Sequence, residues 1–276
     1  MHIIDGKSLA QKIRSEIRQD IHALTHKPTL AVLLVGTDAA SHIYVRLKEK
    51  AAHEAGIHTN IRRLPTECTD QEILKIISEW NADANISGIL LQLPLPPGHD
   101  TDALIQSIDA HKDVDGFHPA NIKQLLSGEG KIVSPVHEGI LRLIASTGID
   151  PRQKRTVLIA NSDIFAIPLE YILRRAGFFV ERMSAASLNA ELLAKADVII
   201  SACGKPFFIS AGMITDGAIL IDVGTTYLPN GKVVGDFDFP SFEKSECYIT
   251  PVPGGVGPMT VALLLKNILQ LATSNT

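Results

Sequence analysis

A phenol and an amine four residues apart are the side chains in this sequence best placed to do acid/base chemistry. Tyr44 and Lys48 belong to a polar stretch, residues 41–48, that follows an apolar run at 29–36. Four residues is the spacing that places two side chains one above the other on one face of a helix. Burial or a nearby positive charge would lower the pKa of the lysine towards neutrality, where its amine exchanges protons with a substrate. The alternative is a solvated helix face that carries an ordinary lysine.

Two further polar features lie at the ends of an apolar run and in a turn. Gln92 ends the apolar part of residues 88–97, whose later prolines remove backbone donors and exclude both helix and sheet. Its amide either serves a site at the end of a strand or only satisfies a buried loop. Asp113 and Asp115 flank a turn within residues 112–119. Such a pair can bind a metal, but an Asx-capped turn is the commoner explanation, and no other ligand pattern in the sequence supports a metal.

The elements that must position these residues alternate between helices and strands. Hydrophobic periodicity predicts helices over residues 6–25, 39–55, 70–80 and 261–271, and one that begins near Pro168, because proline is favoured at the first helical position. It predicts strands over residues 30–35, 58–64, 156–160, 178–182, 197–202 and 218–223, and one that opens at Gly88. This alternation predicts an α/β fold with parallel, doubly wound sheets. Ligands bind such sheets at the carboxyl ends of the strands.

The strand–helix rhythm restarts after residue 155, which predicts two domains. We expect an N-terminal α/β substrate domain of residues 1–137, to which the C-terminal helix within residues 256–276 returns. Residues 138–255 are expected to form a Rossmann-type nucleotide domain. The turn at residues 160–166 contains no glycine, so the G-x-G-x-x-G fingerprint is absent and dinucleotide binding is inferred from topology alone.

The composition is that of a globular protein that binds neither nucleic acid nor a membrane. The 276 residues are 45% hydrophobic and 20% charged, and the net charge is -4 with Lys and Arg scattered along the chain. We find no secretion or transit signal and no apolar run long enough to span a membrane. Cys68, Cys203 and Cys247 fit neither a disulfide framework nor a zinc site. We therefore expect a protein of the reducing cytoplasm.

A glycine- and proline-rich segment near the C-terminus is the last candidate site. Residues 249–260 contain Pro253, Gly254 and Gly255, which let the backbone run close to a flat ligand. A structural turn would explain any two of these residues, but the whole run is unusual.

Taken together, the segments of this chain resemble the bifunctional methylenetetrahydrofolate dehydrogenase/methenyltetrahydrofolate cyclohydrolase family over nearly its whole length. The resemblance rests on Val35-Gly36, Ser41-x-x-Tyr44-Val45-x-x-Lys48, residues 88–96, residues 112–119 with Asn121, Gly204-Lys205-Pro206, residues 221–224, Gly235-Asp236-x-Asp238-Phe239 and residues 251–260. In the family, 5,10-methylenetetrahydrofolate loses a hydride to NADP⁺, and water then opens the methenyl cation to 10-formyltetrahydrofolate in the same cleft.

The resemblance implies a role for each candidate on the folate side. Lys48 would be the catalytic lysine, Tyr44 would stack near the substrate, and Gln92 would tune Lys48 through a hydrogen bond. Asp115 would accept hydrogen bonds from the pterin amino and ring N–H groups, which suits an ionised, bidentate acceptor. Folate would lie along Pro253, Gly254 and Gly255.

The resemblance also implies an NADP site, and here the chain departs from the family. The cofactor residues would be Asn161, Ser162, Asp163, Gly204, Thr225 and Thr226. Asn161 replaces the arginine expected near the 2′-phosphate of NADP, so a charge-assisted contact is lost and NAD becomes an alternative. Ala160 and Ala166 replace two glycines, which adds Cβ atoms where the pyrophosphate should approach. Further departures are Met183-Ser184-Ala185 for Cys-His-Ser, Ser134-Pro135-Val136-His137 for Pro-Cys-Thr-Pro, and Thr226 for Asn.

Three hypotheses remain for the function. The first is the bifunctional enzyme with NADP or NAD, a cytoplasmic homodimer of one-carbon metabolism whose product serves purine biosynthesis. The second is a relative with a weak or lost dehydrogenase step that acts as a cyclohydrolase or folate-binding protein. The third, a catalytically silent folate-binding or scaffold protein, is disfavoured because all four candidate residues are present. A short-chain dehydrogenase is excluded because that family puts its glycine-rich loop before its Tyr/Lys pair.

Overall fold

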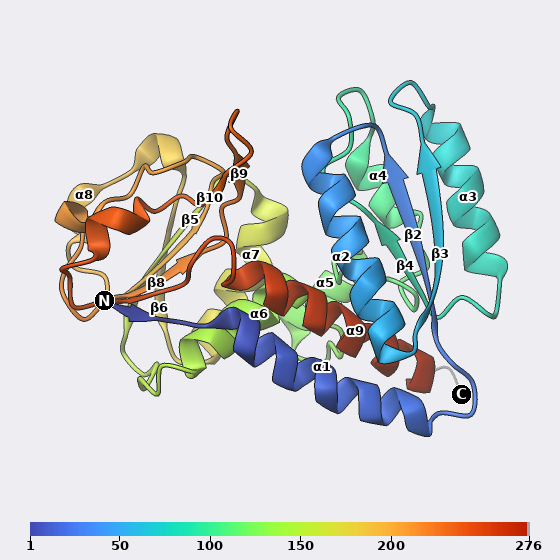
Figure 1. Cartoon of the computed structure of the whole chain (residues 1–276), viewed down its shortest axis with the longest axis horizontal. Helices are drawn as coiled ribbons and strands as arrows, with labels where there is room; N and C mark the ends of the chain where they lie inside the picture. The colour runs from blue at the N-terminus through green and yellow to red at the C-terminus, as the bar shows by residue number, and fades with distance from the viewer. Residues whose placement is uncertain (275–276) are drawn as a thin grey trace. The chain divides into compact units, whose positions relative to one another are not determined.

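The chain folds into two compact units, each built around its own parallel sheet. The computed structural model describes residues 1–274. Residues 10–135 and those from Val261 onward form the unit that we call the three-stranded unit. Residues 1–9 and 136–260 form the six-stranded unit. Both sheets are visible in Figure 1.

The three-stranded unit has the strand order β3-β2-β4, with all strands parallel. Its strands are β2 (Thr29–Val35), β3 (His58–Leu64) and β4 (Gly88–Leu91). Residues 30–35 of the central strand are all buried, which explains the uninterrupted apolar run in the sequence. The helices are α1 (Gly6–Ala23), α2 (Ala39–Ala55), α3 (Asp70–Ala82), α4 (Thr101–Gln106) and α5 (Pro119–Ser127). The predicted helix 39–55 and strand 58–64 are confirmed to the residue.

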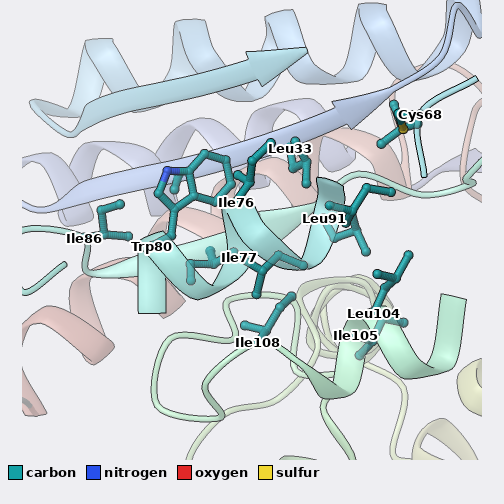
Figure 2. Packing of buried hydrophobic residues seen from close by; sticks show 14 residues of the cluster. Leu33, Cys68, Ile76, Ile77, Trp80, Ile86, Leu91, Leu104, Ile105 and Ile108 are labelled. Carbon is teal, nitrogen blue, oxygen red and sulfur yellow. The ribbon is translucent and has the colours of Figure 1, made fainter. Parts of the chain in front are cut away.

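One face of this sheet is covered by helix α3. Thr69 and Glu72 form a capping box at the start of the helix, and the buried residues Ile73, Ile77 and Trp80 follow at helical spacing. These side chains pack in one cluster with Leu33 of β2, Leu91 of β4 and residues of α4 (Figure 2). The cluster holds the carboxyl ends of β2 and β4 side by side.

The six-stranded unit has the order β1-β11-β8-β7-β5-β6, again with all strands parallel. The strands are β1 (His2–Ile3), β5 (Arg155–Ala160), β6 (Phe179–Met183), β7 (Val198–Ala202), β8 (Ile219–Asp222) and β11 (Tyr248–Ile249). The predicted parallel α/β sheet is thus confirmed. Strand β1 was not predicted, because two residues carry no periodic signal.

The remaining elements of this unit connect its strands. The antiparallel pair β9 (Thr226–Tyr227) and β10 (Val233–Val234) follows β8. The helices are α6 (Pro135–Ala145), α7 (Asp163–Arg175) and α8 (Ala190–Leu193), with short 3-10 helices η1 (Ala185–Ser187), η2 (Ala211–Met213) and η3 (Phe239–Phe242). Helix α7 connects β5 to β6, and its first turn lies at the carboxyl end of β5.

Two helix starts differ from the prediction, and proline is the reason in both. Helix α7 begins at Asp163, so Pro168 lies inside it. A proline there costs about 3 kcal/mol, and the buried side chains of Leu169 and Leu173 on the same helix offset that cost. Helix α9 (Val256–Ser274) begins five residues before the predicted Val261. Pro258 lies in its first turn, where no intrahelical N–H bond is lost.

Helix α9 also corrects the expectation that no segment could span a membrane. Helix α9 is long and apolar enough to cross a membrane, and its most apolar stretch has a mean hydropathy of 1.3. However, 56% of that stretch is buried inside the protein, and Leu263, Leu264 and Leu265 are fully buried. Helices in the core of a globular protein are equally long and apolar, so burial in the core accounts for the apolar character of α9.

Two buried carboxylates tie the loops at the carboxyl edge of the six-stranded sheet. Asp222 accepts hydrogen bonds from the backbone N–H groups of Gly224, Asp236 and Phe237, each at 3.0 Å. Asp236 accepts hydrogen bonds from the Ser201 hydroxyl at 2.6 Å and from the backbone N–H groups of Cys203 and Lys205 at 2.8 Å. Burial raises the pKa of Asp222 to about 7, against the effect of its backbone donors. The loops after β7, β8 and β10 are therefore held by side chains rather than by strand pairing.

This packing makes Gly235 intolerant of a side chain. A methyl group on Gly235 would overlap the carboxyl of Asp222, whereas one on Gly212 would meet nothing within 4 Å. We predict that Gly235→Ala lowers the free energy of unfolding by about 2 kcal/mol or more, the usual scale of overpacking, and that Gly212→Ala changes it by less than about 0.5 kcal/mol. Urea unfolding followed by circular dichroism measures both. Equal effects in the two variants would contradict the assigned close approach.

Candidate functional site

Helix α2 presents Tyr44 and Lys48 from the carboxyl end of strand β2. Asp38 caps the helix by accepting a hydrogen bond from the Ser41 N–H at 2.8 Å, and Gly56 ends it with a φ of 86°. Lys48 is only 6% exposed, and Tyr44 is half-buried. The alternative of an ordinary solvated lysine is therefore wrong.

The Lys48 amine donates a hydrogen bond to Oε1 of Gln92 at 3.0 Å. Nε2 of Gln92 donates to the carbonyl of Leu93 at 2.6 Å, which leaves Oε1 directed at the lysine. Gln92 follows β4 and Lys48 follows β2, two neighbouring parallel strands, so the sheet brings them together across 44 residues of sequence. The amide thus satisfies its own loop and contacts the lysine.

Asp115 lies in a loop that the side chain of Asp113 holds in place. Oδ1 of the buried Asp113 accepts a hydrogen bond from the Gly116 N–H at 3.0 Å, and Oδ2 accepts from the His118 N–H at 2.8 Å. Nδ2 of Asn121 donates to the same Oδ2 at 3.0 Å. The predicted turn with an aspartate cap is confirmed at Asp113, whose carboxylate binds backbone N–H groups three and five residues further on. Asp115 itself is half-buried and makes none of these bonds.

A second support of this loop comes from the C-terminal helix. Nδ2 of Asn267, on α9, donates hydrogen bonds to the carbonyls of Val114 and Val133, both at 2.9 Å. Asn267 is 1% exposed. The residue is separated from Val114 by 153 positions, so no local signal in the sequence pointed to it, and sequence reasoning missed it.

Lys48 and Asp115 perturb each other's protonation. Burial lowers the pKa of Lys48, and the attraction of Asp115 opposes that shift. Burial also raises the pKa of Asp115 to about 6, helped by the negative charge of Asp113 and opposed by Lys48. An amine with a lowered pKa thus faces a carboxyl with a raised one, which is the condition for proton exchange near neutral pH.

The first turn of α7 forms the candidate phosphate site of the six-stranded unit. Ser162 is the N-cap but makes no side-chain cap hydrogen bond, so the first N–H groups of the helix, starting at Asp163, stay available to an anion. Ala166 is 2% exposed, so its methyl group is packed inside rather than set before the helix. Gly204, after β7, has a φ of 64° and open space where a Cβ would be. These features fit a dinucleotide.

The other predicted cofactor residues surround this turn. Oδ1 of Asn161 accepts a hydrogen bond from the Ala185 N–H at 3.3 Å, and its Nδ2 lies 3.5 Å from the Cys203 carbonyl. The hydroxyl of Thr226 donates to the Gly204 carbonyl at 3.3 Å, and Thr225 is half-buried. The loops after β5, β6, β7 and β8 therefore meet around one turn.

The segment at Pro253, Gly254 and Gly255 follows β11 in the six-stranded unit. Gly254 has a φ of 122°, which only glycine adopts readily. Gly255 N–H donates to the Pro251 carbonyl at 2.8 Å, and a methyl on Gly255 would overlap the side chain of Thr250. The glycines at 254 and 255 therefore have structural reasons of their own, while Pro253 is exposed.

The structure thus gathers the candidates into separate clusters. Tyr44, Lys48, Gln92 and Asp115 lie in the three-stranded unit, and the nucleotide turn lies in the six-stranded unit. Over residues 1–274 no group of three His, Cys, Asp or Glu side chains is placed to hold a metal. A Rossmann sheet with an open helix N-terminus, joined to a unit with a buried lysine, defines a two-domain α/β enzyme with an NAD(P)-binding domain.

Comparison with known proteins agrees over both units. Residues 4–115 match the family described as tetrahydrofolate dehydrogenase/cyclohydrolase, catalytic domain, and residues 134–276 match its NAD(P)-binding domain. The bifunctional protein FolD of Campylobacter concisus is 42% identical, with 99% of this chain and 98% of that protein aligned. The chain therefore belongs to the tetrahydrofolate dehydrogenase/cyclohydrolase family, the bifunctional FolD enzymes.

Solved structures support the same assignment. The FolD dehydrogenase/cyclohydrolase of Campylobacter jejuni superposes with a TM-score of 0.94 at 38% identity, over 100% of both chains. The Trypanosoma brucei enzyme, solved with NADP and an inhibitor, superposes with a TM-score of 0.93 at 31% identity, over 99% of this chain and 97% of that one.

The mutual effect of Lys48 and Asp115 can be measured directly. Because the carboxylate raises the pKa of the amine, we predict that Asp115→Asn lowers the pKa of Lys48 further. The titration of the lysine ¹³Cε resonance by NMR, assigned with Lys48→Arg, checks this. Asp102→Asn, which removes an exposed carboxylate on α4, is the matched control. An unchanged Lys48 titration in Asp115→Asn would contradict the coupling.

Proposed function

We propose that the chain oxidises 5,10-methylenetetrahydrofolate to the 5,10-methenyl compound with NADP and hydrolyses that to 10-formyltetrahydrofolate. The observation that carries the proposal is the buried Lys48 amine, held by Gln92 at 3.0 Å and coupled to Asp115. The enzyme would act in the one-carbon metabolism of the cytoplasm, and its product would serve purine biosynthesis.

Lys48 is the proposed proton carrier of the hydrolytic step. Water adds to the methenyl carbon and loses a proton; the bond from that carbon to N5 then breaks, N5 gains a proton and the hydroxyl loses one to become the formyl group. A neutral amine accepts a proton from the water and returns one to N5, and one proton is released overall. The lowered pKa of Lys48 makes the neutral amine accessible. Gln92 holds the amine in place.

Asp115 and Tyr44 are the proposed substrate contacts of this unit. An ionised Asp115 accepts hydrogen bonds from the pterin amino and ring N–H groups, while the Tyr44 ring packs on the substrate from the same helix as Lys48. For Pro253, Gly254 and Gly255 the proposal of a folate contact rests on the family resemblance and on a backbone that exposes little side chain.

NADP is the proposed cofactor, and when bound it accepts the hydride. The first turn of α7, with Ser162 and Asp163, would hold the phosphates, and Asn161, Gly204, Thr225 and Thr226 would line the nucleotide. Asn161 is neutral, so we expect a weaker preference for NADP over NAD than an arginine would give. Weaker cofactor binding at Asn161 also favours a second candidate function, a cyclohydrolase with a weak dehydrogenase step. Such an enzyme would hydrolyse the methenyl compound but reduce little NADP or NAD.

We also propose a homodimer formed through the six-stranded unit. Strand β6 lies at the edge of its sheet, and Phe179 on it is 58% exposed. An edge strand that exposes its backbone donors and acceptors beside a large apolar side chain is a surface that proteins often cover.

The role of Lys48 is tested by its removal. We predict that Lys48→Met abolishes hydrolysis of 5,10-methenyltetrahydrofolate, because no other group replaces the amine. The loss of the absorbance of the methenyl compound with time measures this reaction. Lys50→Met on the same helix, where the side chain is 75% exposed, should retain full activity. Full activity in Lys48→Met would exclude the assigned role.

The role of Asp115 has a signature in pH. Because its pKa is raised to about 6, the carboxyl is ionised above that pH and protonated below it. We predict that KM for the folate substrate rises as the pH falls from 7 to 5, and that Asp115→Asn has a high KM with no such dependence. Steady-state kinetics across this range measures both, and a pH-dependent KM in Asp115→Asn would assign the titration to another group.

A further inference from the structure

The nucleotide turn carries no positive charge of its own. Asn161 stands in the turn after β5, and its amide faces the backbone of Ala185 and Cys203. A 2′-phosphate, which distinguishes NADP from NAD, is bound most strongly by a cation that donates hydrogen bonds. The charge, if the chain supplies one, must come from another element.

Arg182 occupies the position from which a Rossmann fold reads the 2′ group. It is the penultimate residue of β6 and pairs with Leu158 of β5, about 20 residues after the nucleotide turn. An acidic residue at this place binds a ribose 2′-hydroxyl, and an arginine nearby accommodates a 2′-phosphate. After Arg182 the chain continues with Met183, Ser184 and Ala185, so no carboxylate follows to favour NAD.

The guanidinium of Arg182 reaches the mouth of the turn. Its Nη1 donates a hydrogen bond to Oδ1 of Asp163, the first residue of α7, at 2.8 Å. Its Nε lies 3.5 Å from Glu170, a carboxylate that also binds Arg174. The side chain of Asp163 is 80% exposed and that of Arg182 is 36% exposed. Arg182 is thus accessible beside the free N–H groups of the helix, with its charge engaged by Asp163.

We propose that Arg182 is the specificity-determining residue for the 2′-phosphate of NADP and that Asp163 competes with the phosphate for it. The proposal rests on the NAD(P) site of the proposed function and names the residues that set its selectivity. The Asp163 carboxylate already occupies Nη1 of the guanidinium and offsets part of the positive charge that a 2′-phosphate would use. NAD has a hydroxyl at this position, so its binding depends on neither the guanidinium charge nor the Asp163 contact. The ion pair therefore keeps the preference for NADP low but not absent.

Binding measurements on variants of the full-length protein test this directly. Isothermal titration calorimetry with NADP and with NAD gives a ratio of dissociation constants for the wild type, Arg182→Met, Asp163→Asn and the double variant. Arg175→Met, which removes an exposed arginine stacked on Tyr171 at the other end of α7, is the matched control. Thermal unfolding of each variant establishes that it is folded.

The ratio of the dissociation constants for NADP and NAD, rather than either constant alone, tests the proposal. We expect Arg182→Met to weaken NADP about tenfold with NAD nearly unchanged, the size of one charge-assisted hydrogen bond. Asp163→Asn should shift the ratio towards NADP by several fold, and this shift should vanish when Arg182 is also replaced. The control should leave the ratio as it is in the wild type.

Three results would overturn the proposal. An unchanged ratio in Arg182→Met would show that another group binds the 2′-phosphate. A shift in Asp163→Asn that persists without Arg182 would mean that Asp163 acts by simple repulsion. If the folded wild type bound neither nucleotide, both this inference and the proposed cofactor would be wrong, whereas binding of NAD and NADP with no dependence on Arg182 would refute the inference alone.

Discussion

The removal of Lys48 from water is the constraint on which the three-stranded unit depends. A buried ammonium costs several kcal/mol unless it is paired or neutral, and this amine has one neutral acceptor, Gln92, and one nearby carboxyl, Asp115. Burial opposes the charge on both groups, and each group favours the charge on the other. The protonation of the lysine is therefore coupled to that of the carboxyl beside it.

Much of the folate side could be predicted because it obeys local rules and one rule of sheet topology. Tyr44 and Lys48 share one face of helix α2, which follows strand β2. Gln92 follows strand β4, which is paired with β2. Parallel strands bring such residues together however far apart they are in sequence. The contacts that hold the Asp115 loop could be predicted only in part. The turn capped by Asp113 has a local signal in the sequence, but the hydrogen bond from Asn267 depends on how a distant helix packs.

The nucleotide side shows where sequence rules compete. The preference of proline for the first helical position is only statistical. Helix α7 begins earlier, at Asp163, and its buried side chains stabilise it with Pro168 inside. The substitution of Ala166 for glycine suggested a blocked phosphate site, yet its methyl group is buried in the protein. Only coordinates distinguish a Cβ that points at a ligand from one that fills the core. The contact between Arg182 and Asp163 likewise depends on side-chain directions that the sequence does not show.

The bond between Asn267 and the carbonyl of Val114 links the loop of Asp115 to the last helix of the chain. Asn267 follows Val114 by 153 residues, so a nascent chain has Lys48, Gln92 and Asp115 long before it has the residue that supports the loop of Asp115. A chain released early would have the side chains of the site without their final scaffold. The loop of Asp115 therefore gains this support only after helix α9 has been made and has packed.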